Sequence, residues 1–105
     1  MDTRTLGAVA LREAIRRGDT SAEQAVVDAL EAVAHRNPEL NAFITIDADR
    51  ALARARQMDA SADRSGALHG VPVAIKDTIC VRGMRAPAGS RVLADYHPPF
   101  DATAA

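Results

Sequence analysis

The stretch that decides the fold is residues 70–77, which read GVPVAIKD. Successive side chains of a strand point to opposite faces, and both faces of this stretch are apolar as far as Lys76. The pattern predicts a strand over residues 71–76 that is covered on both sides. Lys76 then lies at the C-terminal end of a buried strand, where ligands and catalysis usually lie in α/β sheets.

The chain before this stretch is predicted to be mostly helical. Apolar residues at helical spacing predict helices over Thr5–Arg17, from Ala22 to about Arg36, and over Asp47–Asp63. Gly18 is expected to end the first helix. The second helix is expected to begin with a capping box, made by Thr20 with Glu23 or by Ser21 with Gln24.

Further sequence signals before and after residues 70–77 predict where other elements begin and end. Asn37-Pro38 is expected to end the second helix, because the residue before a proline disfavours the helical conformation. Leu40–Ile46 is rich in β-favouring side chains and predicts a short strand. Residues 77–89 are loop-like, residues 88–94 could form a helical turn, and Asp101 is expected to cap a helix that begins at residue 102.

Composition excludes several classes of protein. A net charge of −1 carries no electrostatic signature of nucleic-acid binding, and no apolar run approaches the ~18 residues of a membrane span. The single cysteine, Cys80, cannot form an internal disulfide, which fits a reducing compartment. We therefore expect a cytoplasmic protein that binds neither nucleic acid nor membrane through this segment.

The core is expected to be thin for the length of the chain. Hydrophobic residues make up 48% of the 105 residues, but Ala supplies 23 of them. Because Ala buries little area, this composition suggests part of a larger domain. The basic residues comprise 12 Arg and one Lys, so Lys76 needs an explanation of its own.

Lys76 has two interpretations. A lysine at a strand end can simply reach into water. A lysine that acts as a general base instead needs burial or hydrogen-bonding partners that bring its pKa from about 10.4 to about 7–8. The apolar stretch before Lys76 and the Gly-containing loop after it suit the second role.

At this block the sequence resembles the amidase signature enzymes, around their catalytic lysine. The resemblance rests on GVPVAIKD, on Gly83 and Gly89-Ser90 after it, and on residues 37–43 and 99–103. It covers essentially the whole chain. It implies an α/β fold, a mixed sheet flanked by helices. Residues 1–105 are then the N-terminal part of a single such domain, with about three helices and one or two strands.

The resemblance also implies a mechanism. The family hydrolyses amides with a Ser–Ser–Lys triad, in which the lysine accepts the proton that activates a serine nucleophile. By position, Lys76 is the catalytic lysine and Asp77, Gly89 and Ser90 support the site. The family's serines lie in a Gly/Ser-rich segment beyond residue 105, so the chain alone is expected to be an inactive, truncated part. The family needs no cofactor, and no metal is expected.

Other assignments of these residues stay open. Ser90 could form a Ser–Lys dyad with Lys76, or could act as a hydrogen-bonding cap. Asp77 could orient its neighbours or simply form a turn. Cys80 has no basic cluster near it in sequence that would activate its thiol. The three histidines, His35, His69 and His97, lack the spacing of metal ligands.

Within the family, residues 75–80 (IKDTIC) and 98–103 (PPFDAT) resemble the amidotransferases that hydrolyse glutamine and release ammonia for tRNA-dependent transamidation. That branch implies B and C subunits as partners. Thr78 and Ala86-Pro87 depart from its pattern and fit a general amidase acting on small amides. A third interpretation is a non-catalytic helical interaction module with Lys76 on its surface.

Overall fold

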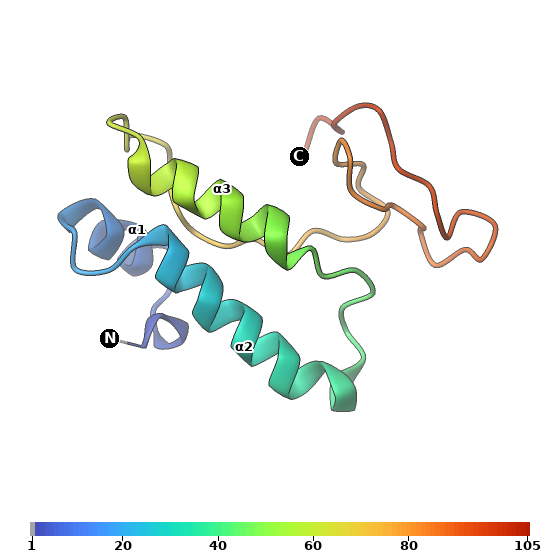
Figure 1. Cartoon of the computed structure of the whole chain (residues 1–105), viewed down its shortest axis with the longest axis horizontal. Coiled ribbons are helices and arrows are strands. Elements are labelled where there is room, and N and C mark those ends of the chain that lie inside the picture. The colour runs from blue at the N-terminus through green and yellow to red at the C-terminus, as the bar shows by residue number, and fades with distance from the viewer. Residues whose placement is uncertain (1) are drawn as a thin grey trace. The chain divides into compact units, whose positions relative to one another are not determined.

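The computed structural model describes residues 2–105, which divide into two compact units. The first extends as far as Pro72, and the second covers Val73–Ala105. The helices of the described residues all belong to the first unit: η1 (Thr3–Thr5), α1 (Ala8–Arg17), α2 (Ala22–Leu40) and α3 (Ala48–Ala60) (Figure 1).

Helix α1 ends where the sequence predicted. Gly18 adopts φ +81°, and its N–H donates to the Ile15 carbonyl at 3.1 Å. The N–H of Asp19 donates to the Ala14 carbonyl at 2.9 Å, which completes a glycine C-cap. The predicted start at Thr5 is wrong, because Gly7 is the N-cap and residues 3–5 form a separate 3₁₀ turn.

The start of α2 is capped from two directions. Ser21 is the N-cap, and its Oγ accepts a hydrogen bond from the Gln24 N–H at 3.0 Å. The Gln24 side chain donates to Asp28 instead of returning to Ser21, so only the serine half of the predicted capping box forms. Asp59 of α3 adds a second cap, because its carboxylate accepts the N–H groups of Ala22 at 2.8 Å and Glu23 at 3.0 Å. Helix α3 therefore satisfies the first turn of α2 with a negative charge, as the helix dipole favours.

Replacing Asp59 by alanine is expected to destabilise the chain by about 1–2 kcal/mol, the usual cost of losing a helix cap. Urea unfolding followed by circular dichroism measures this difference. The matched control is Asp95→Ala in the second unit, which removes an exposed carboxylate and should change little. An Asp59 variant as stable as the Asp95 variant would show that α2 does not depend on this cap.

The predicted end of α2 at Arg36 is wrong, because the helix continues through Pro38 to Leu40. Asn41 ends it instead, with φ +51° and its N–H donating to the Asn37 carbonyl. The Asn37 side chain also binds the Phe43 backbone, accepting from its N–H at 2.8 Å and donating to its carbonyl at 3.1 Å. These local bonds outweigh the single hydrogen bond that Pro38 cannot donate.

Neither predicted strand forms in residues 2–105. Leu40 belongs to α2, and residues 41–47 and 71–76 are irregular. A strand is stabilised by hydrogen bonds to a neighbour, and no segment of the described chain pairs with either stretch. Apolar side chains that a sheet would bury are therefore exposed, by 59% at Ile44, 62% at Val73 and 44% at Ile75. The expected α/β architecture is present here only in its helical part.

Alanine supplies much of the core of the first unit, as the composition predicted. Helices α2 and α3 pack along each other through Ala22, Val26 and Ala55 (Figure 1). A second cluster joins α1 to α2 through Leu11, Ile15 and Ala25, with Leu6 and Val71 packed against it. Val9 of α1 lies outside both clusters and is 67% exposed.

Asp28 of α2 is a buried carboxylate that ties η1 to the helix. It accepts hydrogen bonds from the hydroxyl and N–H of Thr3 and from the Gln24 side chain at 2.8 Å. These bonds, chiefly the one from the Thr3 hydroxyl, hold the pKa of Asp28 below its ordinary value of 3.8. The carboxylate form is therefore favoured by folding.

Because the pKa of Asp28 is lowered on folding, its contribution to stability is present above its unfolded pKa of about 3.9 and disappears as pH falls through its folded pKa. We expect the stability difference between the chain and its Asp28→Asn variant to be largest near pH 7 and to shrink below about pH 4. Urea unfolding at pH 7 and pH 3 tests this. The pKa values of Asp2 and Asp63 are also lowered, but both proteins share that effect. A pH-independent difference would contradict the assignment.

The second unit is organised by backbone hydrogen bonds between two irregular segments, residues 80–86 and 96–102, called the arms here. Ala102 donates to the Cys80 carbonyl at 2.8 Å, Gly83 to Pro98 at 3.2 Å, and Ala86 to Tyr96 at 2.9 Å. The arms therefore run antiparallel, although neither is a regular strand. The predicted helix after Asp101 is absent: residues 103–104 form a turn, and Asp101 Oδ1 accepts from the Arg82 N–H at 2.8 Å across the arms.

Candidate functional site

Lys76, the predicted general base, is exposed in this structure. Its backbone carbonyl accepts from the Ile79 N–H at 2.9 Å, and no hydrogen bond or ion pair of its side chain is formed within residues 2–105. The expected buried strand ending at Lys76 is therefore wrong for this chain. The reason is the absent sheet, because the same pairing that would order residues 71–76 would also cover their ends.

The structure brings Asp77 and Gly89 together, two of the residues predicted to support the site. Asp77 Oδ2 accepts from the Gly89 N–H at 2.8 Å. Gly89 lies in a turn over Pro87–Ser90, closed by the Ser90 N–H donating to the Pro87 carbonyl at 2.8 Å. Both central residues are left-handed, with φ +49° at Ala88 and +70° at Gly89. Asp77, the residue after Lys76 in sequence, therefore holds the turn over Pro87–Ser90.

Ser90 occupies the hydrogen-bonding position expected of it. Its Oγ accepts from the N–H groups of Val92 at 3.2 Å and Leu93 at 3.4 Å. Within the described residues, no hydrogen bond links Ser90 to Lys76, so the Ser–Lys dyad is not formed. The hydroxyl that caps the turn over residues 92–95 is thus committed to backbone.

Replacing Asp77 by alanine is expected to free the Gly89 amide. A typical hydrogen bond contributes about 1 kcal/mol, so exchange of the Gly89 N–H with solvent should become roughly five- to tenfold faster. Amide hydrogen exchange by NMR measures this, with Asp95→Ala as the control that should leave Gly89 unchanged. Equal exchange rates at Gly89 in all three proteins would exclude Asp77 as the residue that fixes the turn.

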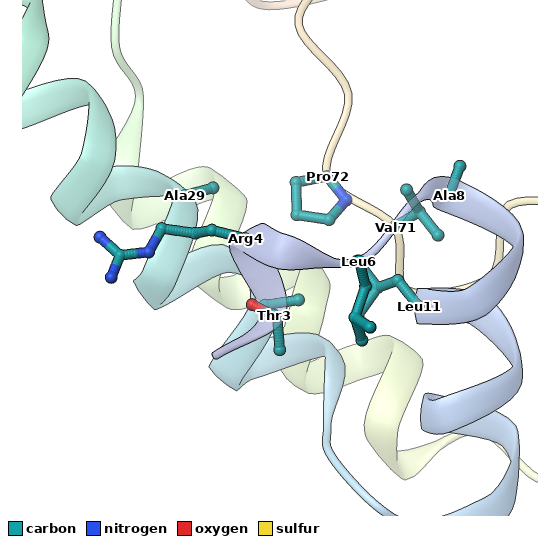
Figure 2. Close-up of a pocket in the computed structure, with 9 residues that line it drawn as sticks. Thr3, Arg4, Leu6, Ala8, Leu11, Ala29, Val71 and Pro72 are labelled. Carbon is teal, nitrogen blue, oxygen red and sulfur yellow. The ribbon is translucent and has the colours of Figure 1, made fainter. Parts of the chain in front are cut away.

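Sequence reasoning missed an open apolar groove in the first unit. It has a volume of about 280 Å³ and lies between η1, α1, α2 and the segment that leads towards Lys76. Figure 2 shows Val71 and Pro72 beside Leu6 and Leu11 along this groove. Val71 and Pro72, near the start of the GVPVAIKD block, line this groove with residues of η1, α1 and α2.

The described residues show no other obvious reaction centre. No group of three His, Cys, Asp or Glu side chains within residues 2–105 is placed to hold a metal ion. Cys80 is half-buried and free. Across the described part of the chain, none of the helices is both long enough and apolar enough to cross a membrane.

Comparison with known proteins identifies the family. Residues 24–105 match the family model described as Amidase. The chain is 45% identical over 94 residues to the A subunit of the glutamyl-tRNA(Gln) amidotransferase of Azoarcus sp. (strain BH72), covering 88% of this chain and 19% of that protein. It is 46% identical over 99 residues to the protein of the same name from Bordetella pertussis, covering 92% of this chain and 19% of that protein.

The matched region covers most of this chain but only a small part of each similar protein. The A subunit from Symbiobacterium thermophilum is 40% identical over 102 residues, which is 93% of this chain and 21% of that protein. The chain thus spans about a fifth of the length of the curated relatives it matches. The family model, in contrast, covers most of the chain and includes the whole GVPVAIKD block. This chain belongs to the amidase family.

Proposed function

We propose that this chain contributes the general base of an amidase active site, and that Lys76 is that base. The observation that carries the proposal is the family match over residues 24–105, which contains the only lysine of the sequence. In the structure, Asp77, which follows this lysine in sequence, accepts a hydrogen bond from the N–H of Gly89. The site is thus a lysine followed by a locally fixed loop.

The chemistry requires groups from outside this chain. A neutral lysine amine takes a proton, through one serine hydroxyl, from a second serine whose oxygen attacks the amide carbonyl. The same proton passes to the amide nitrogen as the C–N bond breaks, which releases the amine and leaves the acyl group as an ester on the attacking serine. Water then hydrolyses this ester to give the acid and the free serine. Ser90 is occupied by backbone donors, and the remaining serines, Ser21, Ser61 and Ser65, lie before the GVPVAIKD block. We therefore propose that the two reacting serines lie in a Gly/Ser-rich segment that follows this region in an intact domain.

Residues 1–105 then represent the N-terminal part of one amidase domain. The exposed side chains of Val73 and Ile75 fit this proposal, because a sheet completed by further strands would bury them. The same completion would bury Lys76 or give it hydrogen-bonding partners, as a general base requires. The added strands that would bury Val73 and Ile75 would therefore also create the surroundings in which Lys76 acts as a base.

The proposed substrate is glutamine, with ammonia released for transamidation of Glu-tRNA alongside B and C subunits. The names of the relatives support this choice. A general amidase acting on small amides is the second candidate, favoured by Thr78 and Ala86-Pro87, which depart from the amidotransferase pattern.

A segment replacement tests the proposal. The matched region of the Bordetella pertussis relative is exchanged for this chain, and glutamine hydrolysis and amidation of Glu-tRNA are assayed with the B and C subunits. Activity within about tenfold of the parent supports an equivalent role. Hydrolysis of small amides without glutamine hydrolysis would support the second candidate.

The isolated 105-residue chain provides the opposite test. It is expected to hydrolyse neither glutamine nor a simple amide, because it lacks the proposed serines. If the purified chain hydrolyses an amide and Lys76→Ala abolishes this activity, the proposal that the reacting serines lie outside residues 1–105 is wrong. A folded replacement protein without any amide hydrolysis would instead favour the interaction module.

A further inference from the structure

Residues 77–83 form the loop that follows Lys76, and this loop has little structure of its own. It contains no helix or strand, and all of its residues belong to the described part of the chain. One local turn is closed by the Ile79 N–H donating to the Lys76 carbonyl at 2.9 Å. A second is closed by the Met84 N–H donating to the Val81 carbonyl at 3.0 Å. The conformation of the loop therefore depends on the segments of the second unit that bind it.

Backbone groups of the arm of residues 96–102 hold the loop at two places. The Cys80 carbonyl accepts from the Ala102 N–H at 2.8 Å. The Gly83 N–H donates to the Pro98 carbonyl at 3.2 Å. Both bonds join backbone atoms, so neither is made by a side chain.

Asp101 adds a bond between these two places, and it does so with its side chain. Its Oδ1 accepts from the Arg82 N–H at 2.8 Å, across 19 positions of sequence. A hydrogen bond from a backbone N–H to a carboxylate is roughly twice as strong as one between neutral groups. The other side-chain hydrogen bond that this arm forms within the described residues joins His97 to the Asp95 carbonyl and does not reach the loop.

These bonds lie only a few residues from Lys76. The turn that begins at the Lys76 carbonyl ends at Ile79, and the next residue, Cys80, is bound to the arm. Asp101 binds two residues further on, at the Arg82 N–H. The backbone of the proposed base is therefore continuous with a loop whose far end is held by Asp101.

We propose that Asp101 is a positioning residue for Lys76, and that it acts by holding residues 77–83 against the arm of residues 96–102. A general base must lie within hydrogen-bond distance of the proton that it accepts, and a displacement of about 1 Å can lower the rate about 100-fold. Asp101 itself touches neither the substrate nor the reacting atoms. This inference rests on the proposed role of Lys76.

A purely structural role of Asp101 is the alternative that the test must separate. An aspartate before residues 102–105 is a suitable cap for a helix in an intact domain. In this structure residues 103–104 form a turn instead, and Oδ1 is bound to Arg82. A helix cap stabilises the fold without acting through Lys76, so the two roles predict different kinetics.

Kinetics of the replacement protein test the positioning role. Asp101→Ala is expected to lower kcat for amide hydrolysis by about 10–100-fold, with KM changed less than about threefold, because the base acts in the chemical step. Asp101→Asn keeps an acceptor oxygen and should stay within about threefold of the parent. Asp95→Ala is the matched control, because it removes an exposed carboxylate of the same unit, and it should have no effect.

A double-variant cycle with Lys76→Ala separates positioning from stability. If Asp101 acts through Lys76, Asp101→Ala should lower kcat by less than about twofold once residue 76 is already alanine. A loss of about tenfold in both backgrounds would assign Asp101 to the fold alone and overturn the proposal. Full activity of the Asp101→Ala single variant would overturn it as well.

The same cycle reports on the proposed base and on folding. If Lys76→Ala alone leaves kcat unchanged, the proposed base is wrong and this inference fails with it, whereas the failures above occur with Lys76 supported as the base. Circular dichroism shows whether each variant folds. If Asp101→Ala does not fold, Asp101→Glu takes its place, because it keeps the charge but moves the carboxylate by one methylene group. A loss confined to the protein that retains Lys76 is again the expected result.

Discussion

Lys76→Ala in the replacement protein is expected to lower kcat for glutamine hydrolysis by about 10²–10⁴-fold, the usual contribution of a positioned general base. The physical reason is that a serine hydroxyl is a weak nucleophile until a neighbouring base accepts its proton. Lys76→Arg is expected to fail to a similar degree, because arginine keeps the charge but does not release its proton near neutral pH. Steady-state kinetics measures both variants.

A control for folding is available in the chain itself. Because Lys76 is exposed and without a side-chain partner in the described residues, Lys76→Ala should leave the free energy of unfolding of the 105-residue chain within about 0.5 kcal/mol. A loss of turnover without a loss of stability therefore assigns Lys76 to the chemistry. Unchanged turnover in Lys76→Ala would reject the assignment, whatever the activity of the replacement protein.

The helices could be predicted because their signals are local. Gly18 ends α1 through its left-handed conformation, and Ser21 caps α2 through a residue three positions later. The strands could not be confirmed, because a strand depends on a neighbour, and residues 41–47 and 71–76 find none in the described chain. Pro38 is a local signal that failed, because the equally local bonds of Asn37 and Asn41 outweigh it.

The candidate site divides in the same way. The Gly89 N–H donates to Asp77 across 12 positions of sequence, and the resemblance placed both residues at the site without predicting this bond. The caps supplied by Asp59 to α2 and by Asp28 to Thr3 join residues 25 or more positions apart, and no sequence pattern marks them. The surroundings of Lys76 depend on contacts of the second kind, so the sequence predicts a role for this residue but does not predict what lies around it.

Gly70→Ala is expected to have the largest effect on stability, at about 3 kcal/mol. Gly70 adopts φ +78°, where an alanine costs about 1–2 kcal/mol. A Cβ there would also lie 2.9 Å from Ile15 Cδ1 and 3.1 Å from the Cβ of Ala22. Overpacking of a core costs about 1–3 kcal/mol more. Urea unfolding gives the total.

Gly18→Ala and Ile15→Val separate the two causes. Gly18 has φ +81° with nothing near its missing Cβ, so its alanine variant should lose only the conformational part, about 1–2 kcal/mol. Ile15→Val removes the Cδ1 atom that the new methyl group would meet, so the double variant Ile15→Val/Gly70→Ala should be more stable than the sum of the single changes predicts, by about 1 kcal/mol. If the single effects add, the contact with Ile15 is not what excludes a side chain at position 70. The GVPVAIKD block would then depend on Gly70 for its backbone conformation alone, and its packing onto α1 would tolerate a larger residue.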